Sequence, residues 1–225
     1  MWIRRMSRLP RGTPRERKTA MKTKKMYVDS RGSGMEEALC MTEKLGAESG
    51  LERKPLLHLR LLAEELFGML RSIAGTVEAE YRVEYEGRSF SLHLRSDLKM
   101  TGEMRQQFLS ASTSGENAAA KGIMGKIRIM IAEFMADDSS ESALLDGLSL
   151  GLMNMASPSA SDVGAGAFFW SMDKYRDEVR KKKNDGEDAA EAWDELEKSI
   201  VANIADDVSV RILGPRVEII VSKAF

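Results

Sequence analysis

The chain has 225 residues, of which 43% are hydrophobic and 31% are charged, with 34 Lys and Arg against 35 Asp and Glu. This length suits one domain with an insertion, and the near-neutral total gives no sign of a strongly charged partner. The single cysteine, Cys40, excludes an internal disulfide and a cysteine-bound metal cluster, and no apolar run is long enough to span a membrane. We therefore expect a cytoplasmic protein without a membrane partner.

Positive charge is concentrated at the N-terminus. Residues 1–25 contain six Arg, four Lys and one Glu, a net charge of +9, which leaves about −10 for the remainder. We expect residues 1–24 to form a disordered basic leader, with the composition of a targeting or nucleic-acid tail but without the apolar stretch of a secretory signal. The alternative is that translation starts at Met21.

The first half of the chain mixes strands and helices. Lys25–Ser30 predicts a short edge strand, and Met35–Lys44 predicts a helix whose apolar face carries Cys40 into the core. Leu56–Ile73 predicts the clearest helix, because its apolar residues recur at three- and four-residue steps. Alternation of apolar and polar residues then predicts a hairpin of Val77–Tyr85 and Ser89–Ser96 with one solvated face.

The second half is predicted to contain a loop, several helices and another hairpin. Thr101–Lys121, rich in Ser, Gly and Ala towards its end, predicts a loop, and Gly122–Met135 has helical apolar spacing. Residues 208–212 and 217–221 alternate around Gly214-Pro215-Arg216 and predict a hairpin. Further helices are expected at Ser142–Met155, Phe168–Lys183 and Asp188–Ala205.

This order of elements predicts the fold class. Helices that must cover one face of a mostly antiparallel sheet give an α+β, two-layer sandwich. We expect a single domain over residues 25–225, with a helical insertion at about 140–205 before the last hairpin.

Two acidic residues, Glu65 and Asp97, are the first candidates for a functional site. Glu65 and Met69 are four residues apart in the helix Leu56–Ile73, so they share one helix face. Asp97 comes directly after the second strand of the first hairpin, and Lys99 follows two residues later. Residue pattern alone favours Glu64 and Glu65 as solvated carboxylates of an amphipathic helix, with Met69 in the core. Asp97 equally caps the loop after a strand.

A third candidate site is the junction between the loop and the next helix. The free backbone N–H groups and the dipole at a helix N-terminus favour a bound anion such as phosphate. Lys121, Gly122, Gly125 and Lys126 stand at this junction, in the segment STSGENAAAKGIMGK. An ordinary loop-to-helix connection would have the same composition.

The element order and these motifs resemble the Bergerat-type ATP-binding fold of histidine kinases, gyrase and heat-shock chaperones, and in particular the anti-sigma factor serine kinases. The resemblance covers about Tyr27 to Ser139 and Asp206 to Lys223. The segment between them, Ser140 to Ala205, has no counterpart in it.

The resemblance implies roles for the candidate residues. Glu65 would be the general base, and Asp97 would accept a hydrogen bond from the adenine amino group of ATP or ADP. Met69 stands where the family has the Asn that holds Mg²⁺, and a thioether is a poor ligand for a hard cation. We therefore expect no metal site and weak or lost nucleotide binding. The phosphate-contacting residues would be Lys121, Gly122, Gly125 and Lys126.

The resemblance also implies a function. We expect a regulatory protein that acts through a protein partner, such as a sigma factor or an antagonist-like domain. One alternative is an interaction protein that keeps only the fold and uses the insertion at 140–205, and another is an active ATPase or serine kinase. We expect no nucleic-acid partner, because the basic run Arg180–Lys183 is followed at once by the acidic NDGEDAAEAWDELEK. A homodimer is left open.

Overall fold

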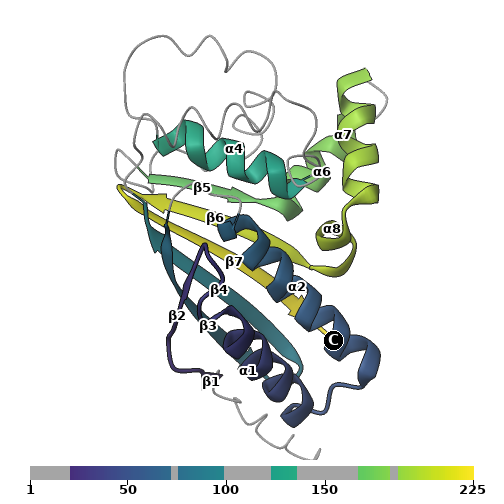
Figure 1. Cartoon of the computed structure of the whole chain (residues 1–225). Coiled ribbons are helices and arrows are strands. Elements are labelled where there is room, and N and C mark those ends of the chain that lie inside the picture. Colours follow the sequence, from purple (N-terminus) through teal and green to yellow (C-terminus); the bar gives the residue numbers. More distant parts are fainter. Residues whose placement is uncertain (1–20, 72–75, 99–122, 136–166, 183–186) are drawn as a thin grey trace, which may run out of the picture.

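The structure is a computed structural model that describes residues 21–71, 76–98, 123–135, 167–182 and 187–225 (Figure 1). The predicted loop Thr101–Lys121 and the predicted helix Ser142–Met155 lie outside the described residues, as do residues 1–20 of the expected leader.

The described strands form one sheet in which each pair of neighbours runs antiparallel. The order across the sheet is β1, β3, β4, β7, β6 and β5, and β2 pairs with β3 beside β1. The strands are β1 (Met21–Lys22), β2 (Met26–Asp29), β3 (Glu78–Glu86), β4 (Ser89–Asp97), β5 (Ala167–Ser171), β6 (Asp207–Leu213) and β7 (Arg216–Ala224).

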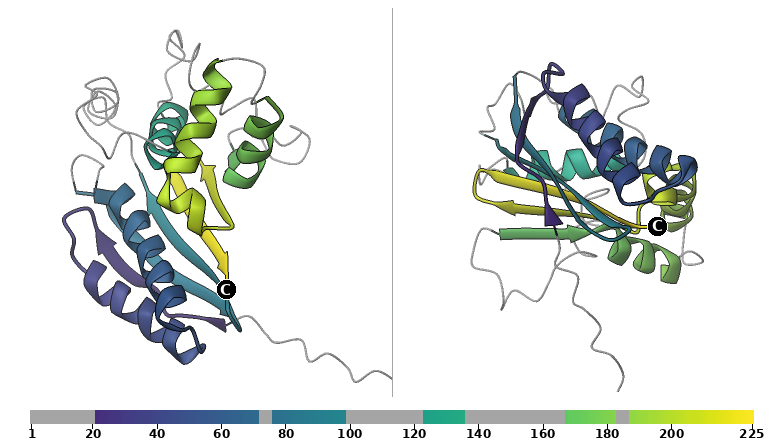
Figure 2. Two further views of the ribbon diagram at one scale, coloured as in Figure 1. Left: turned by 90° about the vertical axis from the view of Figure 1, so that its right-hand side faces the viewer. Right: turned by 90° about the horizontal axis from the view of Figure 1, so that it is seen from below.

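Helices cover one face of this sheet. Figure 1 shows α1, α2 and α4 in front of the strands, and Figure 2 shows the same layering from the side and from below. The helices are α1 (Met35–Glu48), α2 (Arg53–Arg71), α4 (Ile123–Met135), α6 (Met172–Lys182), α7 (Glu187–Lys198) and α8 (Ile200–Ile204). The prediction of an α+β fold with a mostly antiparallel sheet is confirmed, and the arrangement is compatible with a two-layer sandwich.

Tyr81 of β3 joins the sheet to α1 and α2. Its side chain is fully buried, and its ring meets the ring of Phe67 of α2 edge-on, with ring centroids 4.9 Å apart. Thr42 Oγ1 of α1 lies 2.8 Å from the Tyr81 hydroxyl and donates its own hydrogen to the carbonyl of Ala38 at 2.7 Å. Because Thr42 has only one hydroxyl hydrogen, Tyr81 is the donor between the two hydroxyls. Burial raises the pKa of Tyr81 and keeps it a neutral donor.

The predicted helix Phe168–Lys183 is wrong over its first residues. Ala167–Ser171 is the strand β5, which pairs with β6 so that Trp170 faces Val210 and Phe168 faces Ile212. Trp170 is completely buried in this strand. Aromatic residues favour strands because they pack well against their cross-strand neighbours, which explains the extended form of this segment. The described end of the expected helical insertion is therefore built into the sheet.

Three other expectations need smaller corrections. The predicted helix Asp188–Ala205 is interrupted at Ser199, whose side chain accepts a hydrogen bond from Ala202 N and caps α8. The expected leader 1–24 overlaps the sheet, because Met21–Lys22 pairs with β3. Cys40, expected to lie in the core on the apolar face of its helix, is exposed.

The contact between Tyr81 and Thr42 gives a test of this packing. Thr42→Val keeps the volume but leaves the buried Tyr81 hydroxyl unpaired, and we expect a loss of about 1–3 kcal/mol in the free energy of unfolding. Tyr81→Phe added to Thr42→Val removes the orphaned donor, so the double variant should be at least as stable as Thr42→Val alone. Urea unfolding of the parent chain, Thr42→Val, Tyr81→Phe and the double variant measures all four corners of the cycle. A double variant whose losses simply add would show that the two hydroxyls are not coupled.

Candidate functional site

The helix α2 places its two candidate residues in different environments. Met69 is 6% exposed and belongs to the core cluster between the helices and the sheet. Glu65, on the preceding turn, is half-buried, and burial, followed by the charge of Glu64, raises its pKa. The position four residues after Glu65 thus presents an apolar side chain to the core and offers no oxygen ligand to a cation.

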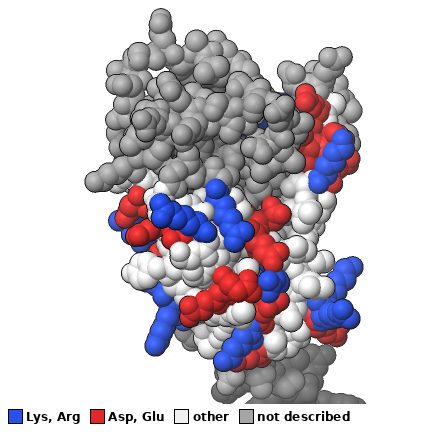
Figure 3. Space-filling model, in the orientation of Figure 1, with Lys and Arg blue, Asp and Glu red and all other residues white. Residues whose placement is uncertain are grey.

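The carboxylate next to Glu65 is part of a charged cluster on α1 and α2. Arg60 Nε lies 2.7 Å from Glu64 Oε1, and its Nη1 lies 2.9 Å from Glu43 Oε2. Figure 3 shows acidic and basic side chains interspersed over this side of the molecule. Glu65 has no ion pair with any described residue, so its negative charge is the less compensated of the adjacent pair.

The helix α4 carries the described half of the predicted phosphate site. Gly125 is buried, and Lys126 forms an ion pair with Glu195 of α7. The side chains of Lys126 and Glu195 are only 14% and 28% exposed, so the lysine is already neutralised and partly withdrawn from solvent. Lys121 and Gly122 lie outside the described residues.

Asp97 does not lie on the helix-covered face. Leu94 pairs with Tyr81, the residue that contacts α2, and side chains alternate along a strand. Asp97, three residues after Leu94, therefore points to the open face, where its Oδ1 lies 3.2 Å from Arg216 Nε of β7. The structure does not bring Asp97 together with Glu65.

The open face of the sheet is polar and internally paired at its centre. His93 Nδ1 lies 3.2 Å from Glu218 Oε1, and its Nε2 lies 3.7 Å from Glu84 Oε1. Arg82 Nη2 approaches the same two carboxylates, at 3.2 Å from Glu84 and 3.7 Å from Glu218. Burial is the largest influence on the imidazole and lowers the pKa of His93, although both carboxylates oppose this shift.

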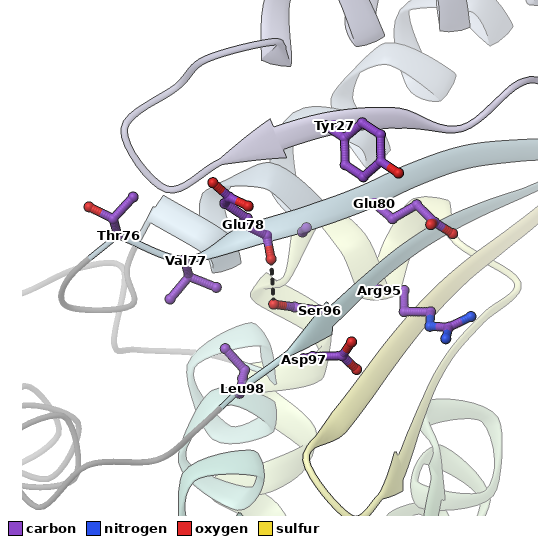
Figure 4. Close-up of a pocket in the computed structure, with 10 residues that line it drawn as sticks. Tyr27, Thr76, Val77, Glu78, Glu80, Arg95, Ser96, Asp97 and Leu98 are labelled. Atoms are coloured by element: carbon purple, nitrogen blue, oxygen red, sulfur yellow. Dashed lines mark hydrogen bonds between the residues drawn. The ribbon is translucent and has the colours of Figure 1, made fainter.

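A cavity of about 520 Å³ opens at one end of this face, between β2, β3 and β4 (Figure 4). Its volume is within the range of small-molecule sites. Sequence reasoning singled out only Asp97 among the residues that line it. The polar and aromatic residues of its lining are Tyr27, Glu78, Glu80, Arg95, Ser96 and Asp97.

Neither a metal site nor a membrane segment is evident in the described part of the chain. No group of three or more His, Cys, Asp and Glu side chains there is arranged to hold a metal ion. Among the described helices, none is both long enough and apolar enough to cross a bilayer.

Comparison with known proteins does not assign the chain to a family. No family model matches the chain, and neither a curated protein nor a solved structure matches it. The structure shows an α+β protein whose mostly antiparallel sheet carries helices on one face and, at one end of the other face, a cavity lined by both polar and apolar residues.

The raised pKa of Glu65 predicts opposite effects for two neighbouring substitutions. A carboxyl whose pKa is higher in the folded state than in the unfolded state destabilises the fold once the pH rises above the unfolded value, here about 4.5. Glu65→Gln removes that charge, so we expect a gain at pH 7, below about 1 kcal/mol because the group is half exposed, that disappears below pH 4.5. Glu64→Gln, the matched control, weakens the contact with Arg60 and should give no such gain. Urea unfolding across this pH range measures both variants, and a less stable Glu65→Gln at pH 7 would contradict the assignment.

Proposed function

We propose that this protein is a regulatory domain that resembles the anti-sigma factor serine kinases in fold, that binds ATP or ADP weakly or not at all, and that acts through a protein partner. The observation that carries the proposal is the environment of Met69. Met69 is buried between α2 and the sheet, and in the family that the chain resembles this position carries the Asn that holds Mg²⁺ for phosphoryl transfer.

Two further placements support weak nucleotide binding. Lys126, near the start of α4, is ion-paired with Glu195, so a phosphate there would compete with an existing ion pair. Asp97 is held by Arg216 on the opposite face of the sheet from α2, so it does not converge with Glu65 on one nucleotide. Because these groups do not converge on one nucleotide, we infer that Glu65 does not act as a general base.

Protein binding is the function that such a chain retains. In the family that it resembles, the partners are sigma factors and small antagonist domains, and these are the partners we propose. The alternative interaction surface, the insertion at 140–205, is not a separable appendage, because β5 pairs with β6 along Ala167–Ser171. Deleting it would unpair part of the sheet, so point substitutions are the better test of that surface.

Calorimetric titration of the full chain with ATP and ADP, with and without Mg²⁺, tests the proposal. We expect a dissociation constant weaker than about 100 μM, or about 5.5 kcal/mol of binding free energy, that changes less than about twofold with Mg²⁺, because no ligand oxygen follows Glu65. In parallel, purified sigma factors and antagonist domains would be titrated against the chain, and a complex with one of them is expected.

The competing activity has a distinct signature. Tight binding that requires Mg²⁺, with phosphate release that is lost in Glu65→Gln and kept in Glu64→Gln, would identify an active ATPase or kinase and overturn the proposal. Loss of release in both variants would instead point to a change in the shared helix surface. Absence of any complex with the protein panel would remove the partner half of the proposal.

A further inference from the structure

The cavity on the open face exists because β3 and β4 part at one end. Their pairing continues in register as far as Glu80 opposite Arg95. Beyond that point, Ser96 Oγ donates to the carbonyl of Glu78 at 2.6 Å, while Leu98 N donates to the carbonyl of Pro215 at 2.7 Å. The end of β4 is thus held on its β7 side, and the gap towards β2 and β3 becomes the cavity of about 520 Å³.

The lining carboxylates that lie next to Arg95 already have cations of their own. Lys25 Nζ lies 2.9 Å from Glu80 Oε2, and Arg216 Nε lies 3.2 Å from Asp97 Oδ1. Figure 4 shows Glu80, Arg95 and Asp97 extending to the same side, with Glu78 apart from them. The charge of the two carboxylates is therefore compensated before any ligand arrives.

Arg95 is different from its neighbours. Within the described residues it has neither an ion pair nor a hydrogen bond from its side chain, and Glu218, its neighbour across the β4–β7 pairing, is engaged by His93 and Arg82. A guanidinium has five N–H donors in a planar fork that matches a carboxylate with two parallel hydrogen bonds. The Arg95 guanidinium, which lines the cavity without a partner among the described residues, is therefore available to bind a carboxylate.

Tyr27 supplies an aromatic wall beside it. Its side chain belongs to β2 and is 75% exposed, which is unusual for a large ring and leaves its face open for stacking. Figure 4 shows the ring of Tyr27 and the guanidinium of Arg95 on either side of Glu80, which pairs with both residues in the sheet. The two side chains together offer one flat surface and one bidentate cation.

We propose that this cavity binds a small molecule that has a planar ring and a single carboxylate, with the carboxylate on Arg95 and the ring against Tyr27. Arg95 is the one Lys or Arg among the described residues that line this cavity, so its single positive charge matches a ligand with one negative charge, and this lining offers no second cation to a dianion such as phosphate. This site is independent of the proposed regulatory function, because it lies on the opposite face of the sheet from Glu65.

Titration of the full chain with benzoate, benzamide and phenyl phosphate, followed by ¹H–¹⁵N correlation spectra, tests the proposal. We expect benzoate to bind at least about tenfold more tightly than benzamide, which has the same ring without the charge, and more tightly than phenyl phosphate. The shifted resonances should belong to residues of β2 and of the ends of β3 and β4.

Three variants separate the site from nonspecific binding. Arg95→Gln should weaken benzoate at least about tenfold and Tyr27→Ser by several-fold. Arg211→Gln, which removes another arginine from the open face beside Phe169, should change nothing. Unchanged melting temperatures establish that the variants fold. Equal binding of benzoate and benzamide, tighter binding of phenyl phosphate, equal loss in Arg95→Gln and Arg211→Gln, or no binding by the parent chain would each overturn the proposal.

Discussion

Tyr81 connects the sheet to both helices that cover its first hairpin, and the placement of the candidate site follows from that connection. Its ring fixes Phe67 of α2 against the sheet, and its hydroxyl is satisfied by Thr42 of α1. Met69 lies two residues beyond Phe67 and therefore on another side of the helix, yet it is buried as well, while Glu65 stays half-buried at the margin. A polar metal ligand at position 69 would have to leave water for an apolar interior, at a cost that a thioether avoids.

Strand alternation imposes the second constraint, because it separates the two acidic candidates. Leu94 faces the helices, and Asp97 therefore faces the open side together with Arg95. The helix-covered face is dominated by apolar packing, whereas the open face holds a network of compensated charges around His93. Outside this network, Arg95 and Tyr27 line one cavity at the end of β4.

Periodicity alone was enough to predict the regular elements. The first hairpin was predictable because Tyr81, Val83, Leu92 and Leu94 repeat with a period of two, and α2 because its leucines repeat at helical steps. The second hairpin shows the same alternation at residues 208–212 and 217–221. The strand β5 was missed because Phe168 and Trp170 run directly into a helix, and only pairing with β6 makes the extended form favourable. The sequence identified Asp97 as a candidate, but the face of the sheet on which its side chain lies depends on the strand register. Arg95 and Tyr27 were missed because their cavity arises where β3 and β4 part, which no local pattern encodes.

The most direct test of the central claim is hydrogen–deuterium exchange of the full chain, with and without millimolar ATP and Mg²⁺. The claim is that α2 and α4 do not assemble a nucleotide site, since Met69 is buried and Lys126 is paired with Glu195. The account predicts unchanged exchange in the segments that contain Glu65 and Lys126. Simultaneous protection of both segments by ATP, dependent on Mg²⁺, would contradict it and restore the helix-covered face as the site of nucleotide binding.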